Sequence, residues 1–344
     1  MTWVADRPGH GSVVVSGPDA TTFLQSLVSQ DLEPLGDGDG ARSLLLTPQG
    51  KLDVILRLLR VATESGEGEA RIGGAGTLRR PSRGPSGPAR SAESGEVEWW
   101  LDCDAGFGEQ LAASLGRFRI RVDAEIRDRS DSWGLLEVRG HEAVPRVAAA
   151  GHLQVPDADG AHVGWGDRRV VRADWPDRPG VDVIGPVGSV HAARDELLRA
   201  GVAPVAPGAY EVARIEAGVP RLGVDVDDRT IPQEAFLETA AVSFTKGCFL
   251  GQELVCRIDT RGHVNRHLRL LRVAGTAIPE PGAEVVAGEK VVGTVTSAAS
   301  VPDESGAVAL AMVRREVEPP SDVRVRWGDG DVSAKVESLP GSGS

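Results

Sequence analysis

The segment KGCFLGQE, residues 246–253, holds the groups with the clearest capacity for chemistry. Cys248 offers a thiol, which reacts as the thiolate, and Lys246 stands two positions before it as a cation that can favour that charge. Gly247 and Gly251 permit positive φ angles or the close approach of a ligand to the backbone. We interpret the segment as a functional loop with Cys248 as a candidate catalytic thiol. The alternative is a glycine-punctuated turn around a buried, inert cysteine.

The other candidate metal ligands form no recognisable site. Cys103, Cys248 and Cys256 contain no Cys-x-x-Cys pair and cannot supply the four thiolates of a structural zinc or a cluster. A reducing cytosol and the odd number of cysteines favour free thiols over a disulfide. His263 and His267 lie four residues apart but lack a zinc motif around them. We therefore expect no resident metal.

The residues Asp225, Asp227 and Asp228 form an acidic cluster, and carboxylate oxygens of this kind are the ligands that a calcium or magnesium ion favours. Its spacing is not that of an EF-hand loop. We expect a solvated connection rather than a metal site.

Composition and charge exclude several classes of protein. The chain has 344 residues, of which 41% are hydrophobic and 26% charged, so it can bury a sizeable core and is not disordered throughout. Its formal net charge of −12 opposes binding to nucleic acid or to an anionic membrane. The amino-terminal residues lack the pattern of a secretion signal, and no apolar run is long enough to span a bilayer. We expect a cytoplasmic protein.

The amino-terminal part of the chain contains two predicted passages from a strand into a helix. Residues 12–17 read as a β-branched strand, and Asp19 can cap a helix from Ala20 onward. A strand at residues 136–138 is followed by the same residue types, which hints at a duplicated α+β unit. The matching residues are Val15, Gly17, Asp19 and Ala20 in the first passage and Val138, Gly140, Glu142 and Ala143 in the second.

The remaining patterns complete a mixed α+β core. Residues 63–96 are rich in Gly, Ser, Pro, Arg and Glu, which predicts a disordered insertion; its arginines are Arg79, Arg80 and Arg83. Other predicted elements are strands at 98–102, 120–126, 169–175 and 181–184 and helices at 107–115 and 190–200. From about His267 the chain changes to five short β-rich runs between Gly and Pro turns, which suit a small antiparallel barrel.

Several segments resemble the YgfZ-type folate-binding proteins, relatives of the glycine-cleavage T-protein. The hallmark of that family is matched by residues 246–253, with Phe249 where tyrosine is usual. The other similar segments are VSGPDATTFLQSLVSQDL at 15–32, LLTPQGK at 45–51, FRIRVDAEI at 118–126, RIEAGVPRLGVDVDDRTIPQEA at 214–235 and GTVTSAA at 293–299. The resemblance covers nearly the whole chain outside residues 63–96.

The resemblance implies a fold and a ligand. The fold would be a cloverleaf of α+β units around a central channel at residues 1–265, with one or two subdomains, then a β-barrel at 266–339 and a disordered tail at 340–344. The ligand would be tetrahydrofolate or a derivative. Glu216 matches the position that serves the pterin in T-protein relatives, where one carboxylate can accept two neighbouring N–H groups. Arg214 would meet either a carboxylate of the folate tail or a neighbouring acid.

The same resemblance suggests roles for the hallmark loop. Gly247 and Gly251 would shape it, while Gln252 and Glu253 would anchor it by hydrogen bonds to the folate channel or the barrel. Lys246 and the loop N–H groups would favour the Cys248 thiolate.

Three functions compete on this basis. The preferred one is a folate-dependent factor that assists assembly or repair of iron–sulfur clusters in client proteins, with Cys248 as its working thiol. The second is a T-protein-like aminomethyltransferase, which needs a carboxylate beside the folate. An ungapped reading from Gly50 places Val54 and Ile55 where T-proteins have an aspartate pair, and Asp53 is one step out of register unless a bulge intervenes. The third is a folate carrier or sensor without catalysis.

Overall fold

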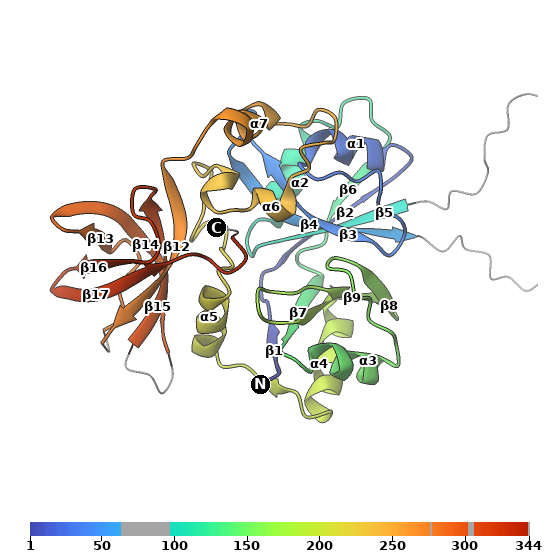
Figure 1. Ribbon diagram of the computed structural model, residues 1–344. Helices are drawn as coiled ribbons and strands as arrows, with labels where there is room; N and C mark the ends of the chain where they lie inside the picture. The colour runs from blue at the N-terminus through green and yellow to red at the C-terminus, as the bar shows by residue number, and fades with distance from the viewer. Residues whose placement is uncertain (63–96, 276, 302–305, 343–344) are drawn as a thin grey trace, which may run out of the picture.

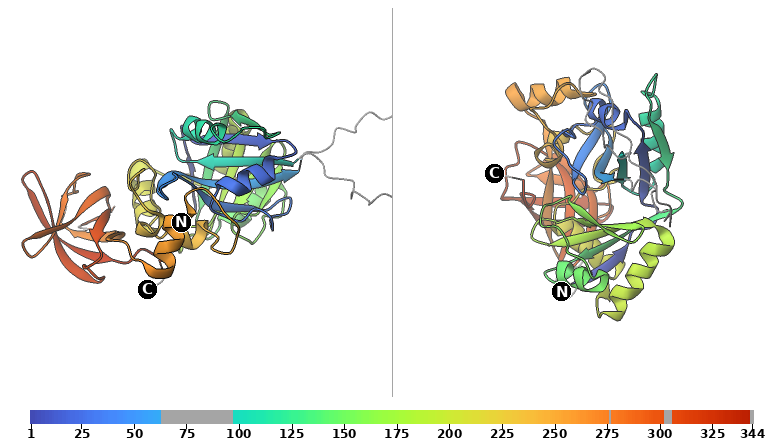
Figure 2. Two further views of the ribbon diagram at one scale, coloured as in Figure 1. Left: turned by 90° about the horizontal axis from the view of Figure 1, so that it is seen from above. Right: turned by 90° about the vertical axis from the view of Figure 1, so that its right-hand side faces the viewer.

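The computed structural model describes residues 1–62, 97–275, 277–301 and 306–342, which form three lobes (Figure 1). Two α+β lobes stack against each other, and a β-barrel stands apart from them on the side of helix α5 (Figure 2). The insertion that we predicted at residues 63–96, with its three arginines, lies outside the described residues.

The first lobe is a five-stranded antiparallel sheet in the order β3-β4-β5-β2-β6. Helix α1 packs on it through a face that buries Ala20, Phe23, Leu24 and Leu27, the helical spacing that the sequence predicted. The elements are β2 (Gly11–Ser16), α1 (Ala20–Leu27), β3 (Gly40–Leu46), β4 (Leu52–Ala62), β5 (Val97–Cys103), α2 (Gly108–Gly116) and β6 (Glu125–Asp128).

One predicted strand of this lobe is shorter than its alternating pattern suggested. We expected a strand over residues 120–126, but β6 begins at Glu125. Arg121 has a φ of 58° and Ile120 is 76% exposed, so the chain turns there instead of pairing. Alternation of polar and apolar residues on the surface was therefore a misleading signal for this stretch.

The second lobe is a six-stranded sheet in the order β11-β1-β7-β10-β9-β8. The first strand of the chain pairs with β7 here, so the amino terminus crosses from the second lobe into the first. The strands predicted near 169–175 and 181–184 are confirmed as β9 and β10, which pair with each other. The elements are β1 (Trp3–Asp6), β7 (Trp133–Arg139), α3 (Ala143–Gly151), β8 (His162–Trp165), β9 (Arg168–Arg172), β10 (Gly180–Pro186), α4 (Val187–Arg199) and β11 (Ala203–Pro204).

The two lobes share the local geometry that the short sequence repeat suggested. Gly17 and Gly140 have φ angles of 120° and 121°, which side chains rarely tolerate. A Cβ atom at either glycine would lie 2.6 Å from a backbone oxygen. Asp19 holds the N-cap position, but its carboxylate accepts the N–H of Asp123 instead of capping α1. The repeat therefore reflects one strand-to-helix turn used twice.

A connecting region of short helices joins the lobes to the barrel. Helix α5 (Pro207–Glu216) packs on the barrel strands, and the chain then returns over the first lobe through η1 (Pro232–Glu234), α6 (Glu238–Ala241) and α7 (Gln252–Arg261). No helix in the ranges described combines the length and hydropathy needed to cross a bilayer.

The carboxy-terminal lobe is a closed antiparallel barrel in the order β12-β15-β14-β13-β16-β17. Its five predicted runs are all strands, and the sixth strand, which the sequence did not single out, pairs with both β12 and β16 and closes the barrel. The strands are β12 (Arg266–Ala274), β13 (Glu284–Ala287), β14 (Lys290–Ser300), β15 (Gly306–Arg314), β16 (Ser321–Trp327) and β17 (Gly330–Glu337). The predicted α+β class with a terminal antiparallel barrel is thus confirmed.

Candidate functional site

A pocket of about 340 Å³ lies where the two α+β lobes meet the connecting region. Strands β4 and β5 line it from the first lobe, and β7 and β10 line it from the second. Residues 217–220, 235–237 and 239–241 and the carboxy-terminal residues 339–342 complete its walls. This volume is within the range of small-molecule sites.

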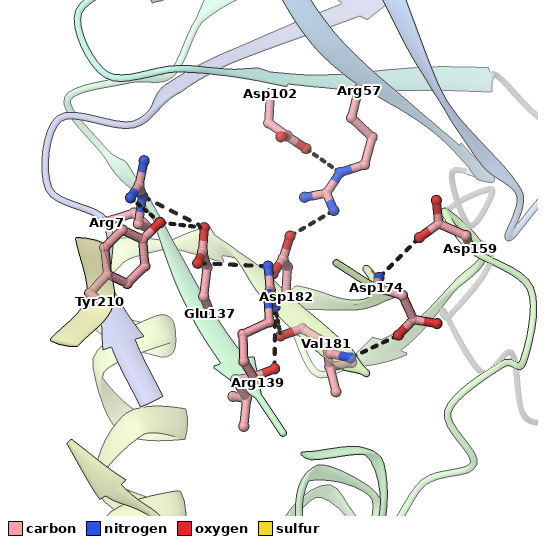
Figure 3. Close-up of polar contacts among 12 residues, drawn as sticks. Arg7, Arg57, Asp102, Glu137, Arg139, Asp159, Asp174, Val181, Asp182 and Tyr210 are labelled. Carbon is pink, nitrogen blue, oxygen red and sulfur yellow. Dashed lines mark hydrogen bonds and ion pairs between the residues drawn. The ribbon is translucent and has the colours of Figure 1, made fainter. Parts of the chain in front are cut away.

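A chain of buried ion pairs crosses this pocket from one sheet to the other (Figure 3). Arg57 on β4 donates from Nε to Asp102 on β5 at 2.8 Å and from Nη1 to Asp182 on β10 at 2.7 Å. Asp182 also pairs with Arg139 on β7 at 2.7 Å. Burial opposes charge on Asp182, yet Arg139 and Arg57 hold the pKa of this carboxyl below its ordinary value.

The chain of charges continues to the amino-terminal segment. Glu137 on β7 accepts a hydrogen bond from the Tyr210 hydroxyl at 3.4 Å and lies 3.6 Å from the Arg7 Nε. Arg7 also donates to the Tyr210 oxygen. Burial raises the pKa of Glu137, and Arg139 acts in the opposite direction. Both sheets therefore contribute alternating charges to one network.

The pocket is electrically balanced. Its lining contains the four cations Arg7, Arg42, Arg57 and Arg139 and the four anions Asp102, Asp104, Glu137 and Asp182. Asp104 accepts the N–H of Leu222, and burial raises the pKa of its carboxyl. A balanced lining suits a polar but neutral ligand better than a polyanion.

Several buried polar atoms in this lining have no hydrogen-bond partner in the described structure. They are His10 Nε2, Arg57 Nη2 and Arg139 Nε. The carboxylate oxygens Glu137 Oε2 and Asp182 Oδ1 also accept no hydrogen bond, although they lie 3.7 and 2.7 Å from Arg139 Nη2 in ion pairs. Unsatisfied polar groups are costly to bury, and a group of them around one cavity is what a polar ligand would satisfy. The set contains donors and an acceptor, so a matching ligand must offer both.

Glu216, which we predicted to bind the pterin, does not line this pocket. As the last residue of α5 it points between the second lobe and the barrel, where it pairs with Arg178 at 3.3 Å and Arg272 at 3.0 Å. The following residues, Ala217 and Gly218, line the pocket instead. Glu216 lines a different pocket together with Arg178 and Arg272, and its expected contact with a pterin stays a prediction.

Arg214 is also committed elsewhere. Its side chain is only 1% exposed and donates to Asp225 at 2.9 Å, to the carbonyl of Val219 at 2.6 Å and to Ser297 on β14 at 3.0 Å. Of the two partners that we considered, the structure selects the neighbouring acid. The same contacts correct the prediction of a solvated acidic cluster for Asp225, which is buried between α5 and the barrel, whereas Asp227 and Asp228 are exposed as expected.

The hallmark loop is fastened to the first lobe by Lys246. The ammonium Nζ donates to the carbonyl oxygens of Gln25, Val28 and Gln30 at 2.7, 2.8 and 2.8 Å, at the carboxyl end of α1. Burial lowers the pKa of Lys246 to about 8. The cation is thus directed at backbone oxygens, and its expected effect on the Cys248 thiolate stays a prediction.

Gly251 provides a second fastening point, as predicted. It has a φ of 77°, and an added Cβ would lie 2.4 Å from the carbonyl oxygen of Thr47 and 3.2 Å from the Cα of Gly50. The glycine of the 45–51 motif therefore meets the glycine of the hallmark loop. Gly247 differs, because an added Cβ there would meet no atom within 4 Å. The presence of glycine at position 247 is therefore explained neither by a positive φ angle nor by the close approach of another atom.

The other loop residues act within the loop. The Gln252 side chain accepts the N–H of Phe249 at 3.1 Å, and Glu253 is an acidic residue in the first turn of α7, where it suits the helix dipole. Neither lines the pocket, and the expected anchoring to a folate channel or to the barrel stays a prediction. The Phe249 ring is 7% exposed and packs in the main core.

The three cysteines lie in different surroundings. Cys248 is exposed, Cys256 is half-buried and Cys103 is buried in the lining of the pocket. All three are free thiols. Cys248 is therefore accessible from solvent, but it does not line the pocket.

Strand β4 shows where residues 53–55 lie, the segment in which T-proteins have an aspartate pair. A bulge leaves Asp53 unpaired between Val54 and Leu52, and Asp53 accepts a hydrogen bond from Gln110 at 2.7 Å outside the pocket. Val54 is fully buried in the core, and Ile55 lines the pocket with an aliphatic side chain. No carboxylate from residues 53–55 reaches the cavity.

The charged residues that line the pocket were not among the candidates predicted from the sequence. Arg57, Asp102, Glu137, Arg139 and Asp182 all lie inside strands whose neighbours are apolar. A charge within a buried strand is the signal that points to such residues, because it is rarely buried without a partner.

The pocket, the two lobes and the barrel define a protein with the fold of the glycine-cleavage T-protein. Residues 266–341 match the family model for the glycine cleavage T-protein C-terminal barrel domain. The crystal structure of the glycine cleavage system aminomethyltransferase T from Bartonella henselae superposes with a TM-score of 0.79 at 22% identity, covering 98% of this chain and 86% of that one.

Curated relatives point to the same superfamily. An aminomethyltransferase from Rubrobacter xylanophilus is 28% identical over 96% of this chain and 80% of its own length. The tRNA-modifying protein YgfZ from Cronobacter sakazakii is 27% identical over 95% of this chain and 89% of its own length. These matches support the T-protein-like superfamily, but they do not distinguish an aminomethyltransferase from a YgfZ-type protein.

Proposed function

We propose that the central pocket binds a tetrahydrofolate-type cofactor. The observation that carries this proposal is the group of buried donors without hydrogen-bond partners, together with two carboxylate oxygens that accept no hydrogen bond, around a charge-balanced cavity. A reduced pterin presents neighbouring N–H donors and a carbonyl oxygen on one edge, which is the mixed pattern that this lining requires. Similarity to aminomethyltransferases and to YgfZ supports the same ligand class.

The lining suggests how the ligand is held. Glu137 Oε2 would accept from the pterin N–H groups, and Arg57 Nη2 would donate to its carbonyl oxygen. Arg42 also lines the pocket but is 40% exposed, so it would meet a carboxylate of the folate tail near solvent. These roles are our proposal for this pocket, whose lining does not include Glu216 or Arg214.

The function that we favour is assistance in the assembly or repair of iron–sulfur clusters in other proteins, with Cys248 as the working thiol. Cys248 is exposed and lies outside the pocket lining, which suits action on a partner protein more than action on the bound folate. Lys246, Phe249 and Gly251 hold its loop on the first lobe, so the thiol is presented at a defined place.

A second candidate is aminomethyl transfer to tetrahydrofolate. The observation in its favour is Asp104, a pocket carboxyl whose pKa is raised by burial and which could therefore exchange a proton with a ligand. Ile55 counts against it, because an aliphatic side chain lines the pocket where T-proteins place a carboxylate. A carrier or sensor that binds folate without chemistry is the remaining alternative.

Calorimetric titration with tetrahydrofolate tests the ligand. We expect the wild type to bind, Glu137→Gln to bind at least tenfold more weakly, and Glu216→Gln to bind like the wild type. The last variant is a matched control, since both lose one carboxylate but only Glu137 lines the pocket. Absence of binding by the wild type, or an equal loss in both variants, would count against the proposed site.

Complementation tests the thiol. In a strain that lacks its own gene for such a factor, we expect the wild type and Cys256→Ser to restore the activity of iron–sulfur enzymes, and Cys248→Ser to fail. Full restoration by Cys248→Ser would refute the thiol role and favour a carrier or sensor.

A reconstituted assay separates the transferase. The protein is mixed with an aminomethyl donor, tetrahydrofolate and the remaining glycine-cleavage components, and methylenetetrahydrofolate is measured. We expect no turnover, and substantial turnover would establish the second candidate instead.

A further inference from the structure

His10 is held in the pocket by the glycines on either side of it. Gly9 has a φ of 72°, and a Cβ atom at Gly11 would lie 2.5 Å from the Cys103 sulfur and 2.7 Å from the N of Gly108. The backbone at this position therefore has little freedom to shift. The imidazole lines the pocket beside the first strand of the first lobe.

The imidazole is neutral and lacks a partner. His10 is 6% exposed, and burial lowers its pKa to about 4. The charged groups that act on it are Asp102, Arg57, Asp182 and Arg7, of which the two acids favour its protonation and the two arginines oppose it. Its Nε2 atom has no hydrogen-bond partner.

A purely structural role does not account for this arrangement. A buried histidine that serves packing normally has a partner for its buried ring nitrogen, as His162 Nε2 has in the carbonyl oxygen of Arg60 at 3.0 Å. An unsatisfied nitrogen destabilises the folded protein, and an aromatic hydrocarbon of similar shape would avoid that cost. The polar atom is useful only when something else occupies the cavity.

We propose that His10 is a specificity-determining residue of the pocket, whose Nε2 forms a hydrogen bond with a ring nitrogen of the bound reduced pterin. This inference rests on the proposed folate site and deepens it. Because the imidazole is neutral, it can accept from an N–H or donate to a lone pair, according to its tautomer. It therefore selects a ligand with nitrogen rather than carbon at the contacted ring position.

The experiment combines binding and stability in three proteins: the wild type, His10→Phe and His10→Asn. Calorimetry measures tetrahydrofolate affinity, and thermal unfolding without ligand measures stability. We expect His10→Phe to bind about tenfold more weakly and to unfold at the same or a higher temperature, and His10→Asn to recover part of the affinity. A structural histidine would give the opposite result, with lower stability and unchanged affinity.

Deaza analogues of tetrahydrofolate, in which carbon replaces N5 or N8, identify the contact. We expect the wild type to bind one analogue about tenfold more weakly than tetrahydrofolate, and His10→Phe not to distinguish the two. If the wild type binds no reduced folate, the proposed function fails, and this assignment fails with it. If the wild type binds but His10→Phe binds equally well and discriminates equally, this inference alone is overturned.

Discussion

Replacement of the two loop glycines by alanine should have opposite consequences. Gly251 has a φ of 77° at the N-cap of α7, and its Cα faces the β3–β4 turn. Gly247 lies four residues earlier in the same motif, and space is open around it. The two substitutions add the same methyl group to the same loop, so each is the control for the other.

The expected magnitude follows from two contributions. A left-handed backbone costs a residue with a Cβ about 1–2 kcal/mol relative to glycine. The new Cβ of Gly251→Ala would also lie 2.4 Å from the Thr47 oxygen and 2.9 Å from the Leu46 Cβ, so the loop or the turn must move, and overpacking of this kind costs about 1–3 kcal/mol. The sum is about 2–5 kcal/mol of folding free energy. Gly247→Ala should change stability by about 0–1 kcal/mol in the favourable direction.

Urea unfolding followed by tryptophan fluorescence measures both variants. We expect a lower midpoint with an unchanged slope for Gly251→Ala, and a midpoint at or above that of the wild type for Gly247→Ala. Gly251→Ala should also lose complementation more than Gly247→Ala, because it disturbs the loop that carries Cys248. Equal midpoints for the two variants would refute the claim that contact between the loop and the β3–β4 turn sets the position of the thiol.

Three further outcomes follow from individual contacts. Lys246→Met should lower the free energy of unfolding by about 1–3 kcal/mol, because the charged hydrogen bonds to backbone carbonyls are lost. The control Lys335→Met, at an exposed position, should change the free energy of unfolding little, and the urea midpoints of the two variants are compared. Arg214→Met should cost about 3–5 kcal/mol, because it leaves the Asp225 carboxylate buried without its ion pair, and a loss under 1 kcal/mol would contradict this. Burial lowers the pKa of His162 from about 6.5 to about 4. As pH falls, the unfolded chain therefore binds the proton at a higher pH than the folded protein does, and the free energy of unfolding should decrease between about pH 6.5 and 4. His162→Gln should weaken that dependence, which unfolding at several pH values will show.

Local structure was predictable where neighbouring residues determine it. The apolar spacing after Ala20 and the Gly and Pro turns of the barrel predicted α1 and five of the six barrel strands. The last strand, β17, escaped because charged and small residues alternate with its few apolar side chains. The fold class followed from these patterns together with the resemblance of the hallmark loop.

The pocket could not be predicted in the same way, because its residues come from strands far apart in sequence. Arg57 and Asp182 are 125 positions apart, yet they share a hydrogen bond of 2.7 Å. Glu216 illustrates the same limit, since its segment reaches this pocket at Ala217 and Gly218 while its own carboxylate points between the second lobe and the barrel. Side-chain direction depends on packing between lobes, and motif spacing alone does not contain it.

The pocket wall and the thiol loop are joined by one short run of backbone, which gives the proposed function a physical basis. Ala240 and Ala241 line the pocket, and their carbonyl oxygens accept hydrogen bonds from Gln30 at 3.3 Å and Ser29 at 2.6 Å. The carbonyl of Gln30 in turn accepts from Lys246 at 2.8 Å. Residues 28–30 thus hold both the wall and the loop. Under the proposed function, a ligand that orders the wall would act on the same anchor that positions the exposed thiol, which would couple ligand binding to the presentation of Cys248.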